Sequence, residues 1–532
     1  MKKQYTYAIL IVLLFLGQFL FINPIGEFAL NDDWVHTEIL KHWSDTGEFR
    51  MSPYAGPTFY MPILYGTALI KTFGFSFSIL RISTLFLALG SLLAFFFLLN
   101  KTNNKPHINI LVVLALWLNP IFYNLSFTFM TDIPALFLFL ISLYFYYIAF
   151  EKKKPGFIFW GSLFSVLGFY TRQTNILLMV AAGVYSLFYL KNIKLRHLFW
   201  SFGIPSLLWL VIFIFLQKNM TALDGPGYHL VPNSEMFGHI KWWLWYSLIY
   251  LGFFSIPFAI GYAFKRIKKH FKNWKLLLAV FIPVILALTI RQTLKMQFPY
   301  VMNIITQYGL GGMEYTLNGV LKSLFSSKIW GVVTLACAAG GGWLLYMFGK
   351  MKQHHEKPFG LFYIFGVIYL IPILILNSFD RYYLPLFIVV GIIIAKQLTF
   401  KKLSALTTLT IIIALGFFSI SQTKFYLAWN EARWDLANNI LEESGLEAHN
   451  IDAGYEWDGW NAYWSGYEAK EGGIPHGAWN GPWWIRNLYV NNTQDYIVSF
   501  SPLKPFEIIE TKKIPGWNPN DTIYLLKGVE EN

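Results

Sequence analysis

Long apolar runs are the feature that most constrains the fold of this chain. Segments of roughly 17 to 24 apolar residues recur over most of its length, and short basic segments separate many of them. An α-helix of that length crosses a hydrocarbon core of about 30 Å. Hydrophobic residues make up 55% of the chain and charged residues 13%, which excludes an ordinary soluble globular protein. The sequence therefore predicts an all-α polytopic membrane domain.

Thirteen membrane spans are expected from the positions of these runs. The expected spans are 5–22, 78–100, 107–123, 131–150, 157–170, 174–190, 197–217, 241–264, 275–290, 328–348, 359–376, 382–395 and 403–421. The first resembles a signal peptide, but no small-residue cleavage pattern follows it, so we interpret it as a retained span. The stretch 59–73 is too short for a crossing and is expected at the interface or half inserted.

Basic residues gather in every second loop, which predicts the orientation of the chain. By the positive-inside rule, the N-terminus is cytoplasmic and the C-terminal part is external. This clustering also explains the net charge of +13 without a nucleic-acid partner. The single cysteine, Cys337, allows no intrachain disulfide, and these features together predict a bacterial plasma membrane protein.

The composition changes after the last expected span. Residues 424–532 contain 8 Lys and Arg against 16 Asp and Glu, so we divide the chain into a membrane domain, 1–423, and a soluble external domain, 424–532. A helix over 431–444 and strands over 495–500 and 522–527 predict a small α+β fold there. The tryptophans of this domain could stack on sugar rings, but core packing and interface anchoring are the simpler explanation. They include Trp429, Trp434, Trp457, Trp460, Trp464, Trp479, Trp483 and Trp484.

An acidic motif, Asn31-Asp32-Asp33-Trp34-Val35-His36, lies in the first outer loop, 23–77. Two adjacent carboxylates beside a span are costly to desolvate, so they stay in water, face a cation or serve a polar reactant. The simpler alternative is that Asp33 caps an interfacial helix that presents Val35, Ile39, Leu40 and Trp43.

Further charged residues are expected at the external ends of later spans. These are Arg81, Asp132, Arg172, Arg291, Asp380 and Arg381. Each has a structural alternative: Asp132 before Pro134 suits a helix N-cap with proline in the first turn, arginines favour helix C-termini and can snorkel, and Asp380 with Arg381 can simply pair.

Together these residues suit glycosyl transfer from a lipid-linked sugar. Arginines at membrane depth offer planar donors to a phosphate whose lipid tail lies in the bilayer, and a nearby carboxylate accepts the proton of an attacking hydroxyl. A divalent cation, Mg or Mn, would help the leaving group, with Asp32 and Asp33 as partial ligands, although the sequence leaves its need open. His36 and Glu38 have no second histidine at ligand spacing, so a dedicated metal site there is disfavoured.

Several short motifs resemble membrane glycosyltransferases of GT-C architecture. They are Asn31-Asp32-Asp33-Trp34, Phe73-Gly74-Phe75-Ser76 with Leu80-Arg81, Phe129-Met130-Thr131-Asp132 with Pro134, Thr171-Arg172-Gln173, and Arg381-Tyr382 with Leu384-Pro385. The chain is similar in this order of motifs to the group that contains protein O-mannosyltransferases and the lipid A aminoarabinose transferase. Where members of that group often show Glu-Lys-Pro-Pro, this chain has Gly56-Pro57-Thr58-Phe59-Tyr60-Met61-Pro62.

The resemblance implies an inverting transferase that uses a polyprenyl-phosphate-linked sugar. It implies a catalytic role for Asp33 or Asp32, of which we favour Asp33 as the base, and a supporting role for Asp132. Donor-phosphate contacts carry over to Arg172 and Arg381. The other external arginines, Arg81 and Arg291, are further candidates for the phosphate.

The expected activity is therefore sugar transfer at the external membrane face to a lipid, glycan or protein acceptor, in cell-envelope assembly or protein glycosylation. A transporter or flippase of a lipid-linked saccharide is the alternative, and it predicts charged or broken helices at mid-bilayer and inverted repeats. The sequence shows neither clearly. A third reading is a non-catalytic envelope assembly protein with a binding module outside.

Overall fold

A computed structural model of the chain describes residues 2–52, 55, 58–188, 195–219, 235–265, 273–350, 359–461 and 495–528. Six residues named above lie outside this described part: Gly56, Pro57, Trp464, Trp479, Trp483 and Trp484.

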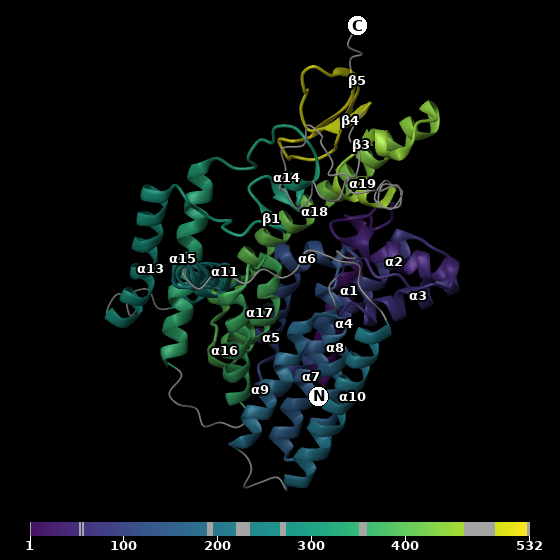
Figure 1. Ribbon diagram of the computed structural model, residues 1–532. Coiled ribbons are helices and arrows are strands. Elements are labelled where there is room, and N and C mark those ends of the chain that lie inside the picture. Colours follow the sequence, from purple (N-terminus) through teal and green to yellow (C-terminus); the bar gives the residue numbers. More distant parts are fainter. Residues whose placement is uncertain are drawn as a thin grey trace.

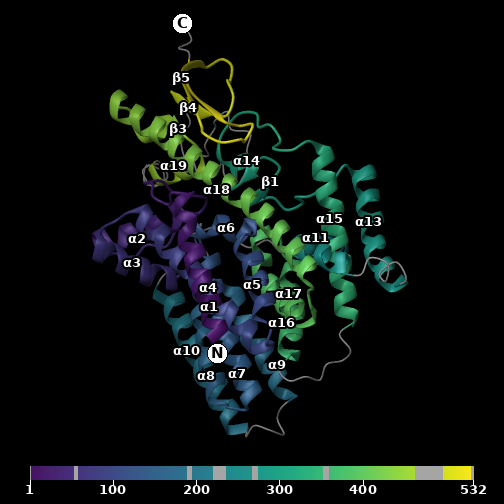
Figure 2. The same cartoon turned by 180° about the vertical axis from the view of Figure 1, so that it is seen from behind.

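The structure is a bundle of helices that carries a small sheet at one end (Figure 1). The start of α1 lies towards the opposite end of the bundle from the sheet, as both views show (Figures 1 and 2). The helices of the first half are α1 (Lys2–Gly17), η1 (Gln18–Leu20), α2 (Asp33–Thr46), α3 (Met61–Phe73), α4 (Phe77–Thr102), α5 (Pro106–Trp117), α6 (Pro120–Ser126), α7 (Asp132–Lys152), α8 (Gly156–Phe169), η2 (Gln173–Asn175), α9 (Ile176–Leu187), α10 (Leu195–Asn219) and α11 (Met236–Lys265). Those of the second half are α13 (Trp274–Leu294), α14 (Met313–Thr316), α15 (Ser327–Lys350), α16 (Gly360–Ile375), η4 (Asp380–Tyr383), α17 (Leu384–Gln397), α18 (Lys402–Ser444), η5 (Ala448–Asn450) and α19 (Tyr455–Asn461).

Within the described residues, seven helices are long and apolar enough to cross a membrane: α4, α7, α10, α11, α13, α15 and α18. The pair α5 and α6, bent by 65°, makes an eighth if it is one broken span. Four shorter apolar helices lie at Gln4–Leu20, Gly156–Phe169, Gln173–Leu187 and Gly360–Ile375. Of the thirteen expected spans, seven fall on these long helices, one falls on the bent pair, and the described parts of the other five fall on shorter helices. The chain is a polytopic helical membrane protein.

Several helices expose broad apolar surfaces that require lipid. On α13, Phe281, Ile282 and Ile285 are each more than half exposed. Exposed aliphatic and aromatic side chains in such density would be unfavourable in water, so this face suits the hydrocarbon core.

Glycines let α11 and α15 pack with their backbones in contact. A Cβ atom added to Gly340 of α15 would lie 2.4 Å from the carbonyl oxygen of Gly252 on α11. A Cβ atom added to Gly252 would lie 2.0 Å from the carbonyl oxygen of Cys337. Small residues at such crossings let helices approach closely, which is how helices in membranes gain packing energy.

Helix α18 connects the membrane bundle to the C-terminal part of the chain. Its 43 residues give a length of about 65 Å, roughly twice the thickness of a hydrocarbon core, so one half extends beyond the membrane. The domain boundary expected at residue 423 falls inside this continuous helix. The predicted helix 431–444 is the outer half of α18.

A four-stranded sheet lies beyond α18. Its strands are β3 (Ile451–Asp452), β4 (Tyr496–Ser499), β5 (Glu507–Lys513) and β6 (Thr522–Lys527), in the order β3-β4-β6-β5. Strand β3 is parallel to β4, whereas β6 is antiparallel to both β4 and β5. The two predicted strands correspond to β4 and β6. A short hairpin of β1 (Ile305–Thr306) and β2 (Gly309–Leu310) packs against α18.

The first outer loop folds into two helices, α2 and α3, which pack on each other beside the end of the bundle nearest the sheet (Figure 1). The interfacial helix expected after the acidic motif is α2. The stretch 59–73 contains α3, whose Leu64 and Phe73 are exposed, as an interfacial helix requires.

We predict that Gly340→Ala destabilises the protein by about 1–3 kcal/mol, because the added methyl group meets the α11 backbone. The control is Gly349→Ala on the same helix, where a Cβ atom meets nothing within 4 Å. Thermal unfolding in detergent measures both. Equal melting temperatures for the two variants would contradict the backbone contact.

Candidate active site

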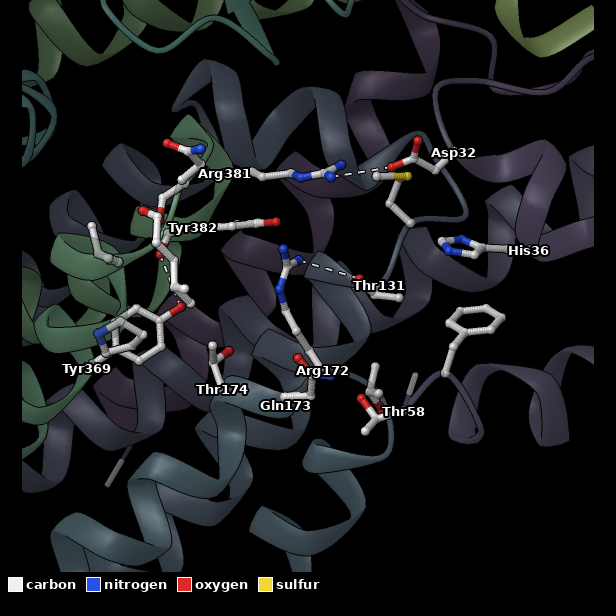
Figure 3. Close-up of a pocket in the computed structure, with 18 residues that line it drawn as sticks. Asp32, His36, Thr58, Thr131, Arg172, Gln173, Thr174, Tyr369, Arg381 and Tyr382 are labelled. Carbon is white, nitrogen blue, oxygen red and sulfur yellow. Dashed lines mark hydrogen bonds and ion pairs between the residues drawn. The ribbon is translucent and has the colours of Figure 1, made fainter. Parts of the chain in front are cut away.

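A cavity of about 270 Å³ lies where the ends of several helices meet (Figure 3). Its polar lining includes Asp32, His36, Thr131, Arg172, Tyr369, Arg381 and Tyr382. The start of α2, the turn before α7, the segment between α8 and α9, helix α16 and the turn η4 contribute these side chains. Of the seven site residues expected from the sequence, three line this cavity: Asp32, Arg172 and Arg381.

Arg172 is held by a carboxylate and an aromatic ring. Its Nη1 forms an ion pair with Oδ1 of Asp132 and lies 3.4 Å from Oγ1 of Thr131. Its guanidinium carbon lies 4.4 Å from the ring centre of Tyr382, a cation–π geometry. Asp132 is the first residue of α7, and Thr131 stands at the N-cap. The expectation of Asp132 as an N-cap is therefore wrong, and its carboxylate serves the arginine instead.

Arg381 is buried, and two of its N–H groups have no hydrogen-bond partner among the described residues. Its Nη2 lies 3.3 Å from Oδ2 of Asp32, and its Nε lies 4.0 Å from Oδ2 of Asp132. Among the described residues, neither Nε nor Nη1 has a hydrogen-bond partner, although the side chain is only 9% exposed. A buried N–H group without an acceptor is costly, so these two donors are suited to receive an oxygen ligand from the cavity.

The charges of these four residues cancel. Arg172 and Arg381 balance Asp32 and Asp132, which allows all four to be held at the edge of the membrane bundle. Binding of an anion in the cavity would therefore depend on N–H donors that point at it, because the cluster carries no net positive charge.

Asp32 is the accessible carboxylate of the acidic pair. Its side chain is 32% exposed, and it lies at the N-cap of α2 without making a capping hydrogen bond. Its oxygens instead face Arg381 and the hydroxyl of Tyr455, which donates to Oδ1 at 2.9 Å. Figure 3 shows Asp32 and Arg381 joined across the cavity.

Asp33 lies outside the cavity. Its side chain is buried, and Oδ1 accepts a hydrogen bond of 2.8 Å from the backbone N–H of Phe129. Burial raises the pKa of Asp33 to about 8, which offsets the effect of that hydrogen bond. The alternative that Asp33 caps α2 is also wrong, because α2 begins at Asp33 and the capping position belongs to Asp32.

Two of the expected arginines lie outside the cavity and form hydrogen bonds within the protein. Arg81 donates to the carbonyl oxygens of Pro24 at 2.7 Å and Phe28 at 2.8 Å, and it is fully buried. Arg291 donates to Gln297 and to the carbonyl oxygen of Ser327. Both therefore order the outer loops.

His36 forms part of the cavity wall as a neutral imidazole. Its ring stacks on Phe59 at 4.0 Å, and its Nδ1 lies 3.3 Å from the carbonyl oxygen of Phe129, so Nδ1 carries the proton. Burial lowers the pKa of His36 to about 4.

The acidic pair does not form a joint metal site. Asp32 faces Arg381 and Tyr455, whereas Asp33 faces the amide of Phe129. No group of three or more His, Cys, Asp or Glu residues suited to a metal ion occurs in the described part of the chain. The expectation that Asp32 and Asp33 share a divalent cation therefore does not fit the side chains present.

Two tyrosines of this site were not predicted as functional residues from the sequence. Tyr382 appeared only within a motif, and its ring lies between the two arginines (Figure 3). Tyr455 comes from the C-terminal part, 423 residues after Asp32. The acidic and aromatic composition of residues 455–458 is the only hint of a functional role in the sequence around Tyr455. No local pattern predicts which distant residue such a side chain contacts.

No model of a known protein family matches the chain, and neither does any curated protein. Two solved structures are similar to it over 99% of its length and 98% of theirs. They are ArnT from Cupriavidus metallidurans bound to undecaprenyl phosphate, at 10% identity and a TM-score of 0.46, and the same protein in the apo state, at 11% and 0.39. These neighbours belong to the group that the sequence motifs resemble.

We predict that the unfolding free energy decreases as the pH rises from 7 to 8.5. In the unfolded chain Asp33 ionises near its ordinary pKa, but the folded protein keeps its proton until about pH 8, so folding becomes less favourable by up to about 1.4 kcal/mol per pH unit near pH 7. The contribution of His36, whose pKa is lowered, is already complete above its ordinary value near 6.5.

The measurement is thermal unfolding in detergent across this pH range. Asp33→Asn should flatten the dependence, since the amide oxygen still accepts from Phe129 and cannot ionise. Asp45→Asn, at an exposed position of the same helix, is the control and should retain the wild-type slope. An unchanged slope in Asp33→Asn would contradict the neutral state of Asp33.

Proposed function

We propose that this protein is an inverting membrane glycosyltransferase that uses a polyprenyl-phosphate-linked sugar. The observation that carries the proposal is the cavity in which a partly exposed carboxylate, Asp32, faces a buried guanidinium, Arg381. Two N–H donors of this guanidinium have no hydrogen-bond partner among the described residues.

The cavity borders a helix that suits contact with a lipid tail. Pro372 and Ile373 of α16, with Leu376 just after it, form an apolar side of the cavity. On the same helix Val367 and Ile371 are exposed, at 66% and 51%. A prenyl chain lying along α16 would bring its phosphate to Arg381 and Arg172.

In the proposed reaction the acceptor hydroxyl attacks the anomeric carbon of the sugar. Its oxygen forms the new glycosidic bond from the face opposite the phosphate, and its proton passes to an oxygen of Asp32. The bond between the anomeric carbon and the phosphate oxygen breaks, and its electron pair remains on the lipid phosphate. The donors of Arg381 and Arg172 stabilise this negative charge, and the configuration of the sugar inverts.

The proposal assigns the base to Asp32 in preference to Asp33, because Asp32 lines the cavity and Asp33 is occupied by the amide of Phe129. Asp132 supports both arginines. Arg81 and Arg291 are omitted from the phosphate site, since they hold backbone carbonyl groups elsewhere.

We further propose that the cavity opens to the outer side of a bacterial plasma membrane. The opposite positions of the start of α1 and the C-terminal sheet, together with the basic loops, support an N-terminus in the cytoplasm and an external C-terminal domain. The acceptor is a lipid, glycan or protein of the envelope. A carrier of lipid-linked saccharides is the alternative, and transfer of label away from the lipid distinguishes an enzyme from a carrier.

We predict that Asp32→Asn lowers sugar transfer by about 100-fold or more, because an amide cannot accept the hydroxyl proton. The assay incubates purified protein with labelled polyprenyl-phosphate hexoses and envelope extract and follows label leaving the lipid. Asp45→Asn is the matched control on α2. If Asp33→Asn abolished transfer at constant stability while Asp32→Asn did not, the assignment would pass to Asp33.

We predict that Arg381→Gln raises the KM for the lipid-phosphate donor by about 10- to 100-fold, since charged hydrogen bonds to the phosphate are lost. Arg291→Gln is the control, because this arginine lies outside the cavity. The same label-transfer assay, run over a range of donor concentrations, gives KM. A similar KM in both variants would refute the phosphate site.

A further inference from the structure

Helix α19 of the external part packs directly on α2, the helix whose N-cap is Asp32. This contact joins residues near 455 with residues near 32, far apart in the sequence. Figure 1 shows α19 between the sheet and the upper end of the bundle, close to α2. The contact places residues of the external part next to Asp32, the proposed base.

Both oxygens of Asp32 are held from outside its own loop. The hydroxyl of Tyr455 donates to Oδ1 at 2.9 Å, and Nη2 of Arg381 lies 3.3 Å from Oδ2. A carboxylate with one donor on each oxygen has its plane fixed, while about two lone-pair positions remain for a proton from the acceptor.

The residue after Tyr455 fixes the chain before Asp32. Oε1 of Glu456 accepts a hydrogen bond of 2.9 Å from the backbone N–H of Asn31, which lies at φ +56°. Its other oxygen pairs with Arg433 of α18, and both side chains are buried. Because a left-handed backbone is uncommon for a residue with a side chain, this external support helps to stabilise the turn.

Packing restricts Tyr455 to this position. Its ring meets the fully buried Trp34 edge to face, with ring centres 5.8 Å apart. A Cβ atom added to Gly459, one turn further along α19, would lie 2.4 Å from Trp34. The close fit between α19 and Trp34 therefore prevents the tyrosine from swinging away from Asp32.

Tyr455 is a donor at any physiological pH. Burial raises the pKa of Tyr455 well above its usual value, so the phenol keeps its proton. It does not line the cavity, so it acts on a substrate only through Asp32.

We infer that α19 completes the active site from the external domain, with Tyr455 as the positioning residue that orients the Asp32 carboxylate. This inference rests on the proposed function. It adds that the membrane bundle alone lacks a correctly oriented base, so the external domain is required for the chemical step.

The first test is Tyr455→Phe, which removes one hydroxyl and keeps the ring contact with Trp34. We expect kcat to fall by about 10- to 100-fold, since a hydrogen bond to a charged group is lost, with the KM for the lipid donor and the melting temperature unchanged. Tyr496→Phe, in β4 of the same external part and outside the cavity, should keep the wild-type kcat. An unchanged kcat in Tyr455→Phe, or equal changes in kcat and KM, would overturn the inference.

The second test measures hydrogen exchange and needs no activity. The amides of Asp33, Val35 and His36 donate to carbonyl groups of Leu30 and Asp32, so loss of the Tyr455 hydroxyl should speed exchange across residues 31–36 several-fold. Tyr496→Phe again provides the control. Identical exchange in Tyr455→Phe and wild type would overturn the positioning role. Absence of sugar transfer by the wild type, with faster exchange in Tyr455→Phe, would refute the proposed function and leave the contact established.

Discussion

The pairing of buried and partly buried charges at one end of the bundle is the constraint on which the rest of the site depends. Taking an arginine or an aspartate out of water costs several kcal/mol unless a partner of opposite charge is in place. Arg172 and Arg381 meet Asp132 and Asp32 within a few ångströms, and the four residues come from four separate segments. The helix ends must therefore assemble together, which forms the cavity as a consequence.

The C-terminal part of the chain belongs to the same assembly. Helix α18 is long enough to leave the membrane and carries Arg433, which holds Glu456 and thereby α19 against the acidic loop. The division into a membrane domain and a soluble domain, drawn from composition, remains a useful description of where the charges lie. The contacts join the two parts at the site itself.

Adjacent aspartates in the motif have different environments because of helix geometry. Successive side chains at the start of a helix point about 100° apart, so Asp32 reaches the cavity while Asp33 turns to the backbone of Phe129. A similar separation occurs among the four arginines that the sequence predicts at the external face. Two reach the cavity, and two are used for backbone carbonyl groups. No pattern in the local sequence distinguishes members of either set.

The sequence by itself determined the helices, the membrane class and two of the strands. The length and the periodicity of an apolar run are local properties, and they decide whether a segment can span a bilayer and which backbone conformation it favours. It also placed the acidic motif and the arginines at helix ends. Only the tertiary structure decided which of them meet, and it brought in Tyr382 and Tyr455. Such contacts join residues hundreds of positions apart, and their partners are fixed by how whole helices pack rather than by the neighbours of each residue along the chain.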